Sequence, residues 1–169
     1  MEKMKRFKTF VVRLLWLYAI SWVVNWLSYR FLKSRVLNRR KWDLNICCGT
    51  TDGGGVNVDI QIHEAVPNLV HVDDICRLPF ADQQFDTVLC SHTIEHVDDP
   101  EAFYQELQRV GRHVTLLTPP LWDLSAAFNP LEHKWLFWSV QTEHSSLPPY
   151  TRLPLSECLH RVFGQRIVA

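Results

Sequence analysis

The stretch Lys41–Ile60, KWDLNICCGTTDGGGVNVDI, decides the fold of this chain. We expect a short apolar strand through Leu44 and Ile46 to end at a tight turn that contains Gly49. Three glycines then lead into a second strand that ends at Asp59. A glycine turn lets backbone N–H groups approach a ligand closely, and a carboxylate at the next strand end is placed to accept hydrogen bonds from ribose hydroxyls. The stretch therefore predicts a site for a ribose-containing ligand.

Composition limits the classes of protein to which this chain can belong. Its 169 residues suit one domain with a real core. Lysine plus arginine and aspartate plus glutamate are equal at 18 each, so no basic excess indicates a nucleic-acid partner. Five cysteines without a C-x-x-C pair argue against a disulfide framework or a structural zinc site. A reducing, cytosolic compartment is the better expectation.

The N-terminal segment has an unusual composition. Residues 10–32 are strongly apolar and aromatic, and they lie between the basic segments 1–8 and 33–41. The uninterrupted apolar part, Leu14–Val24, is short for a helix that crosses a bilayer, which takes about 20 residues. Its tryptophans and tyrosines favour a membrane boundary, and a helix that spans and a helix that lies in the interface both stay open. The alternative is a helix that packs on the domain or on a second subunit.

Two domains are expected: a membrane-associating helix with basic flanks at residues 1–39, and an α/β domain at residues 40–169. The basic residues that follow the helix slightly outnumber those that precede it. The positive-inside rule therefore places the second domain on the cytoplasmic side of a membrane.

Strands and helices alternate after Asp59. The pattern predicts strands at 69–72, 85–90 and 114–117 and a helix at 100–110 that Asp98 or Asp99 caps. Such alternation indicates a Rossmann-like, mostly parallel sheet that binds ligands at the carboxyl ends of its strands. After Pro120 we expect a short helix and loops, a last helix at 155–163 and a short strand at 165–168, so that the far edge of the sheet is trimmed.

Two further motifs carry a resemblance to a known family. Residues 73–88 read DDICRLPFADQQFDTV, and residues 90–100 read CSHTIEHVDDP. Together with the opening stretch they resemble the class I S-adenosylmethionine (SAM) dependent methyltransferases, in the branch whose first motif reads LNxGCG…NVD. The resemblance implies SAM as the cofactor and a Rossmann-like fold.

The resemblance also assigns expected roles to individual residues. The loop with Asn45, Cys47, Gly49 and Thr50 would hold the methionine end of SAM, and Asp59 would bind the ribose. Asp74 would reach the adenine amino group, the backbone of Ile75 would donate to it, and Ser91 would face the cofactor, while Leu78, Pro79 and Phe80 form an apolar wall. Glycine is usual in this family where Cys47 and Thr51 stand here.

Histidines are the expected proton acceptors, because an imidazole with a pKa of about 6.5 can take a proton from an oxygen or nitrogen acceptor. The candidates are His92, His96 and His133. The spelling H-x-x-E-H at His92–His96 is also that of inverted zinc peptidases, but it precedes a helix instead of lying within one. Some quinone-pathway methyltransferases bind a divalent metal through a carboxylate and this Glu-His pair. Because His92 replaces that carboxylate, we expect no metal.

The expected function is transfer of a methyl group from SAM to a membrane-associated or amphipathic acceptor, either a small molecule or a lipid-linked one. The alternative is a degenerate, non-catalytic methyltransferase-like module that serves as a binding or partner subunit. A dinucleotide-dependent oxidoreductase is disfavoured, because the glycines of G-x-G-x-x-G are absent.

Overall fold

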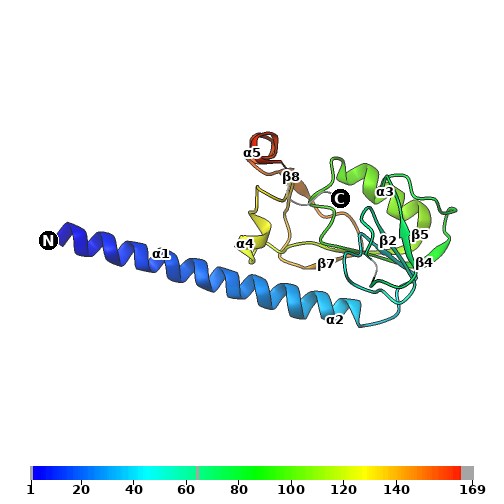
Figure 1. The fold of residues 1–169 in the computed structure, drawn as a ribbon, viewed down its shortest axis with the longest axis horizontal. Helices are drawn as coiled ribbons and strands as arrows, with labels where there is room; N and C mark the ends of the chain where they lie inside the picture. Colours follow the sequence, from blue (N-terminus) through cyan, green and yellow to red (C-terminus); the bar gives the residue numbers. More distant parts are fainter. Residues whose placement is uncertain (1, 64, 165–169) are drawn as a thin grey trace.

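One long helical segment forms the N-terminal part of the chain. The computed structural model describes residues 2–63 and 65–164. In it α1 (Glu2–Leu27) continues through the π-helix η1 (Ser28–Lys33) into α2 (Ser34–Leu37), and α1 projects away from the rest of the molecule (Figure 1). Within the described residues, this segment is the one helix long and apolar enough to cross a membrane.

A six-stranded sheet is the centre of the second domain, with the strand order β3-β2-β1-β4-β5-β7. The first five strands pair in parallel, and the two-residue β7 joins the edge antiparallel to β5. This confirms the predicted Rossmann-like sheet. The strands are β1 (Leu44–Ile46), β2 (Val56–Asp59), β3 (Leu69–His71), β4 (Phe85–Ser91), β5 (Gly111–Leu117) and β7 (Glu143–His144).

Helix α3 (Pro100–Val110) covers one face of the sheet, as the sequence predicts. Asp99 caps it, since its carboxylate accepts hydrogen bonds from the N–H groups of Glu101 and Ala102. The apolar stripe of the helix packs on the strands in the main core cluster, and its members are Phe103, Tyr104, Leu107 and Val110. Capping and periodicity are local signals, which is why this helix was predictable to the residue.

The opposite face is covered by parts of the chain that the sequence pattern did not assign to it. Val36 of α2 and Trp42 pack on Leu89 and Leu117 in a second buried cluster. The loop between β1 and β2 contains no helix and folds back on this face, where the N–H of Trp42 donates to the carbonyl of Gly53 at 2.8 Å. The end of the N-terminal helix is thus part of the domain core.

The segment after β5 holds more structure than expected. The short helix α4 (Leu124–Ala127) and the last helix α5 (Ser156–Phe163) were predicted. The strands β6 (Trp135–Phe137) and β8 (Tyr150–Arg152) were not: they pair antiparallel in a separate two-stranded sheet. The prediction of loop for these two stretches was therefore wrong. The strand predicted at residues 165–168 lies outside the described residues.

Candidate functional site

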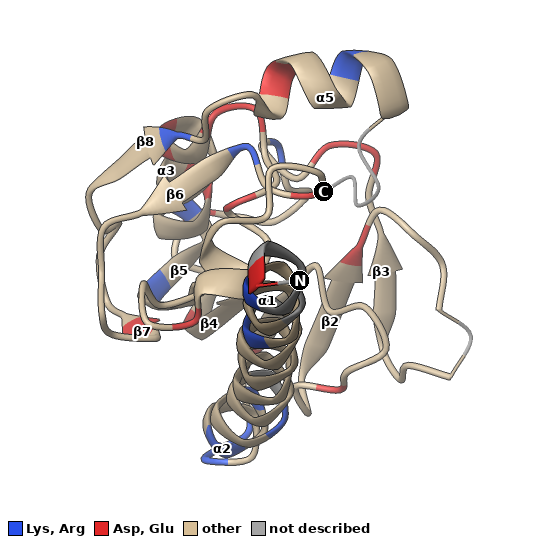
Figure 2. Cartoon of the chain, turned by 90° about the vertical axis from the view of Figure 1, so that its left-hand side faces the viewer, with Lys and Arg blue, Asp and Glu red and all other residues tan. Residues whose placement is uncertain are grey.

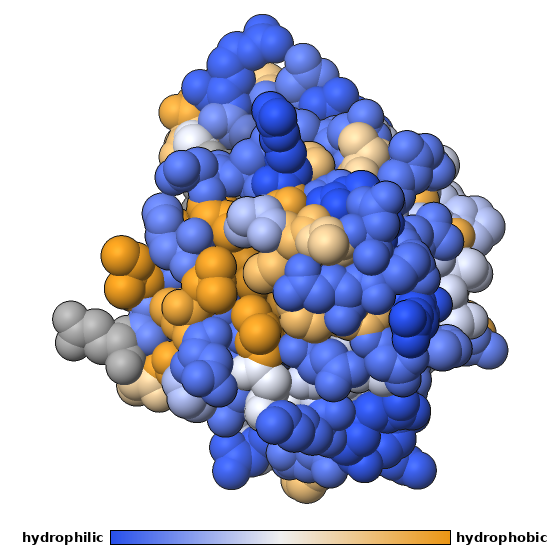
Figure 3. Space-filling model, turned by 90° about the vertical axis from the view of Figure 1, so that its right-hand side faces the viewer, coloured by the Kyte–Doolittle hydropathy of each residue, from blue (hydrophilic) through white to orange (hydrophobic). Residues whose placement is uncertain are grey.

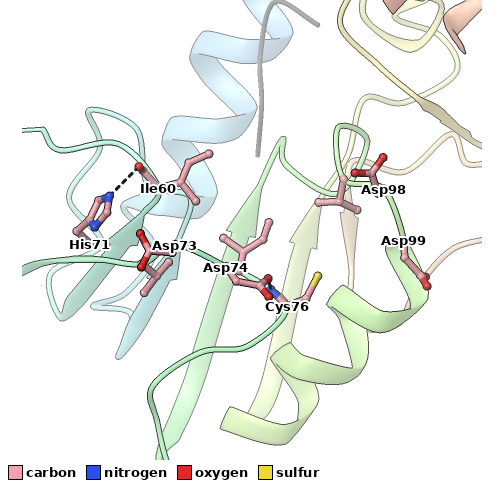
Figure 4. Close-up of a pocket in the computed structure, with 10 residues that line it drawn as sticks. Ile60, His71, Asp73, Asp74, Cys76, Asp98 and Asp99 are labelled. Atoms are coloured by element: carbon pink, nitrogen blue, oxygen red, sulfur yellow. Dashed lines mark hydrogen bonds between the residues drawn. The ribbon is translucent and has the colours of Figure 1, made fainter. Parts of the chain in front are cut away.

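A cavity of about 370 Å³ opens at the carboxyl end of the parallel strands (Figure 4). Asp74 and Ile75, which were expected to contact adenine, both line it. Its remaining walls come from the ends of β2 and β3 and from the loop before α3: Ile60, His71, Val72, Asp73, Cys76, Val97, Asp98 and Asp99. Four of these residues are aspartates, so the cavity has a negative potential that favours a cationic ligand.

Asp59 lies next to this cavity, at the tip of β2. It is only 6% exposed, and its two oxygens accept hydrogen bonds from backbone N–H groups, at 2.8 Å from Gly49 and at 2.9 Å from Gln61. The glycine turn after β1 and the acidic residue that ends β2 are therefore in direct contact. The structure thus brings together the two features from which the sequence predicted a ribose site.

The turn after β1 has an unusual backbone. Cys47 has φ of 49° and Gly49 has φ of 55°, both in the left-handed region that side chains disfavour. Cys47 thus adopts, with a side chain, a conformation that suits the glycine usual at this position. Its thiol is desolvated, and burial raises its pKa, with Cys90 and Asp59 adding to the effect.

The other predicted cofactor residues divide into two groups. Thr50 is exposed in the same turn, and Ser91 is buried at the end of β4, where its hydroxyl has no hydrogen-bond partner among the described residues. Asn45 is different, because its side chain donates to Asn57 Oδ1 and to the carbonyl of Thr51. The side chain of Asn45 therefore braces the loop and does not line the cavity.

The three candidate histidines gather around one buried carboxylate. His92 Nδ1 lies 3.5 Å from Glu95 Oε1, an ion-pair distance at the limit of hydrogen bonding. The rings of His96 and His133 meet edge to face with centroids 4.7 Å apart. One ligand atom each of Glu95, His96 and His133 lies within 4.8 Å of the others. The structure thus places His133 against the loop after β4, although His133 lies 37 or more positions further along the sequence than His92, Glu95 and His96.

Electrostatics in this cluster favour an ionised carboxylate beside a neutral imidazole. Burial opposes ionisation of Glu95, but the facing side chains of His92, His96 and His133 outweigh it and lower the pKa of Glu95 to about 2. Burial lowers the pKa of His133 to about 4. At neutral pH the cluster therefore contains a buried carboxylate and a neutral His133.

Sequence reasoning missed several residues of the site. His63 Nε2 lies 3.7 Å from Asp59 Oδ2, and His71 Nε2 is 3.0 Å from the carbonyl of Ile60 at the cavity wall. Asp98 and Asp99 were expected only as helix caps, yet both line the cavity. A signal existed for the two aspartates, since the turn before α3 had to lie at the carboxyl end of β4. The sequence holds no such signal for the two histidines.

Comparison with protein families gives one match. Residues 55–116 match the model of a family described as a methyltransferase domain. The matched range runs from the glycines before β2 to the end of β5, and it contains Asp59, the cavity loop and Glu95. Comparison with curated proteins gave no match.

Solved structures with similar folds include three with more than half of their length aligned. They are a SAM-dependent methyltransferase from Aquifex aeolicus (17% identity, TM-score 0.39, 50% of this chain and 62% of that one), a SAM-dependent methyltransferase from Mesorhizobium loti (13%, 0.38, 64% and 57%), and a protein from Pyrococcus horikoshii (16%, 0.42, 83% and 81%). This chain spans about three fifths of the length of the first two, and 45% of a further similar protein from Anabaena variabilis.

Proposed function

We propose that this chain, whose residues 55–116 match the model of a methyltransferase domain family and whose sheet is mostly parallel, transfers the methyl group of SAM to a membrane-associated or amphipathic acceptor. The observation that carries the proposal is the contact between Gly49 N–H and Asp59 Oδ2, next in sequence to Ile60, which lines the acidic cavity. A glycine turn joined to a strand-end carboxylate supports binding of a ribose there.

The described residues fit SAM in size and charge. The cavity volume is within the range of small-molecule sites, roughly 300–1,000 Å³. SAM carries a net positive charge at neutral pH, and the aspartates of the wall give the cavity a negative potential that attracts it. The buried hydroxyl of Ser91, without a partner in the described part of the chain, is available to a polar group of the ligand. SAM supplies an electrophilic methyl group, and the protein has mainly to align the acceptor with it.

Among the three histidines, His92 is best placed to take a proton from the acceptor. Its side chain is 17% exposed, whereas His96 and His133 are buried. The carboxylate of Glu95 lies behind it and would orient the ring and stabilise its charged form, as the third member of a triad does. A base is useful only if the acceptor is an oxygen or a nitrogen.

The membrane-associated acceptor is inferred from the distribution of exposed apolar residues. Figure 2 looks along α1, whose surface is mostly uncharged between its basic first turns and the basic region of α2. The side of the domain turned away from α1 is mostly hydrophilic (Figure 3). On α1 and α4 large apolar side chains are exposed to between 40% and 71%, including Trp16, Tyr18, Trp22 and Leu124.

The way in which α1 meets the domain favours insertion into one leaflet. Ser125 of α4 donates a hydrogen bond from its hydroxyl to the carbonyl of Ser21 at 3.2 Å, and Ser28 is buried. The helix therefore lies against the domain from Ser21 onward. The apolar part that projects, Phe10–Ile20, is about 16 Å long, roughly half of the hydrocarbon thickness of about 30 Å. We infer a helix that lies in the interface of the cytoplasmic leaflet, with the domain on the same side.

A second function, a module that lacks catalysis, is favoured by one observation. Cys47 places a side chain in a left-handed turn where the family has glycine, and this could narrow the methionine end of the site. Binding of SAM separates the two proposals.

The test is calorimetric titration of SAM and of S-adenosylhomocysteine into the full chain in detergent micelles. We expect binding of both, and a loss of at least tenfold in affinity for Asp59→Asn. The matched control is Asp86→Asn, because Asp86 is an exposed aspartate at the opposite end of the sheet. No binding by the folded wild-type chain would overturn the enzyme proposal and leave the binding-module alternative.

The acceptor is then sought with SAM that carries a labelled methyl group and a total membrane lipid extract. Label in the organic phase that His92→Asn reduces and Asp86→Asn does not would support both the acceptor class and the role of His92. Label that appears only in the aqueous phase would contradict the lipid-linked acceptor.

A further inference from the structure

The carboxylate of Glu95 is buried and has no hydrogen-bond partner in the described part of the chain. Glu95 is 1% exposed, and neither of its oxygens accepts a well-formed hydrogen bond from the described residues. Burial of an ionised carboxylate costs several kcal/mol or more unless it is paired or bound to a metal. Oε1 lies 3.5 Å from His92 Nδ1, and a cation bound by the carboxylate would further stabilise this buried charge.

The two histidines beside Glu95 each place a ring nitrogen close to its carboxylate. His96 Nδ1 bonds the carbonyl of Glu132 at 2.9 Å, so Nε2 carries the lone pair. The buried Nδ1 of His133 has no hydrogen-bond partner among the described residues. A carbonyl that fixes the tautomer of a histidine is the usual support behind a metal-ligating imidazole.

We propose that Glu95, His96 and His133 bind one divalent transition-metal ion of the Zn²⁺ class. The donor set of two imidazoles and one carboxylate suits Zn²⁺ and its neighbours, and it suits Mg²⁺ poorly, because Mg²⁺ prefers oxygen ligands. The three ligand atoms lie within 4.8 Å of one another, so small side-chain rotations bring them to one ion. A water molecule completes the coordination.

The expectation of no metal rested on the histidine at position 92, where a carboxylate would be the ligand. In this proposal the third ligand comes instead from His133, in the segment between α4 and β6. That segment is already fixed to the loop before α3, since the N–H of Lys134 donates to the carbonyl of Glu95 at 2.8 Å and Trp135 Nε1 donates to that of Val97 at 2.9 Å. The ion would lock the two segments together and neutralise the buried charge.

The test uses the full chain in detergent micelles after removal of metals with a chelator. Zn²⁺ is titrated by calorimetry, and Co²⁺ is followed by its visible absorption, which reports nitrogen and oxygen ligands. We expect one tight site for Zn²⁺, at least 100-fold weaker binding of Mg²⁺, and a loss of about 100-fold in Zn²⁺ affinity for His133→Ala and for Glu95→Gln. His113→Ala is the matched control, because His113 is exposed and bonds the carbonyl of Asp86 instead.

Folding of each variant is checked by circular dichroism, and the Co²⁺ spectrum of the wild-type chain keeps the test decisive if a variant unfolds. Absence of a Co²⁺ band from the folded wild-type chain overturns the proposal. So does Zn²⁺ binding that a folded His133→Ala variant retains, since it would place the ion elsewhere. Metal binding is independent of SAM binding, so either proposal can fail without the other.

Discussion

Arg109 donates two hydrogen bonds to the carboxylate of Glu106, from Nε to Oε2 at 2.8 Å and from Nη2 to Oε1 at 2.7 Å. The same two side chains hold the loop that precedes β4. Glu106 Oε1 accepts from the N–H of Leu78 at 2.6 Å, and Arg109 donates to the carbonyls of Leu78 and Phe80. One ion pair on α3 thus fixes the segment between the cavity residue Ile75 and the core residue Phe85.

Glu106→Gln should make the stability of the protein less dependent on pH below 5. The hydrogen bonds from Arg109 lower the pKa of Glu106, so its stabilisation is full above the unfolded pKa of about 4.3. This stabilisation is lost as the pH falls through the lower pKa that Glu106 has in the folded state. We expect the variant to lose about 2 kcal/mol at pH 7 and less at pH 3, because charge-assisted hydrogen bonds contribute roughly 1.5–3 kcal/mol.

Urea unfolding at several pH values measures this dependence. Glu101→Gln, an exposed glutamate on the same helix, is the control and should change stability little. An equal loss for Glu106→Gln at pH 7 and pH 3 would contradict the assignment to the carboxylate charge.

Cys47→Gly should be more stable than Cys47→Ala by about 1 kcal/mol. Both variants remove the same thiol, so their difference isolates the cost of a side chain at a φ of 49°. A side chain in this left-handed conformation costs roughly 1–2 kcal/mol. The difference between the variants is smaller than this cost, because the unfolded glycine variant has the greater chain entropy. Denaturant midpoints of the two variants give the comparison, and equal midpoints would mean that the backbone relaxes at this turn.

Gly55→Ala should destabilise the domain by about 3 kcal/mol or prevent folding. An added Cβ would overlap the backbone carbonyl oxygens of Trp42 and Asp43, which cannot move without displacing β1. Gly49→Ala is an instructive comparison, because a Cβ there meets nothing within 4 Å and its cost comes from backbone conformation alone. Thermal unfolding ranks the two, and a smaller loss for Gly55→Ala would contradict the close approach.

An epitope tag at the N-terminus should be cut by external protease when the chain is bound to the outside of sealed vesicles. A helix in the interface keeps its N-terminus on the same side as the domain, whereas a spanning helix carries it to the lumen. Immunoblotting before and after detergent gives the answer. Protection of the tag until detergent is added would contradict the one-leaflet proposal.

Local signals made much of this fold predictable. The capping residue Asp99 and the apolar spacing of α3 gave that helix its bounds, and the strand ends at Asp59 and Ser91 gave the edge where the cavity lies. Pairing across long separations was not predictable. The contact of Trp42 with Leu117 and the pairing of β6 with β8 depend on how finished elements pack, which no window of sequence contains.

The candidate site shows the same division. The sequence named all three histidines, because their residue type and their place after predicted strands were visible. It could not show that the ring of His133 meets His96, or that the carboxylate of Glu95 lies buried between them. The hydrogen bond of Asn45 was also not visible in the sequence: its side chain donates to Asn57, a residue of the neighbouring strand.

The joint between the N-terminal helix and the domain has a mechanical consequence. Trp42 Nε1 donates a hydrogen bond to the carbonyl of Leu37. Arg39 donates two hydrogen bonds, of 2.6 and 3.1 Å, to the carboxylate of Glu143 on β7. Val36 is buried against the sheet as well, so the end of the N-terminal helix is held to the domain at several points. If this helix lies in a membrane interface as proposed, the edge of the sheet that carries the cavity is held at a fixed distance from the lipid surface. Acceptors would be sorted by how far their nucleophile rises from the bilayer.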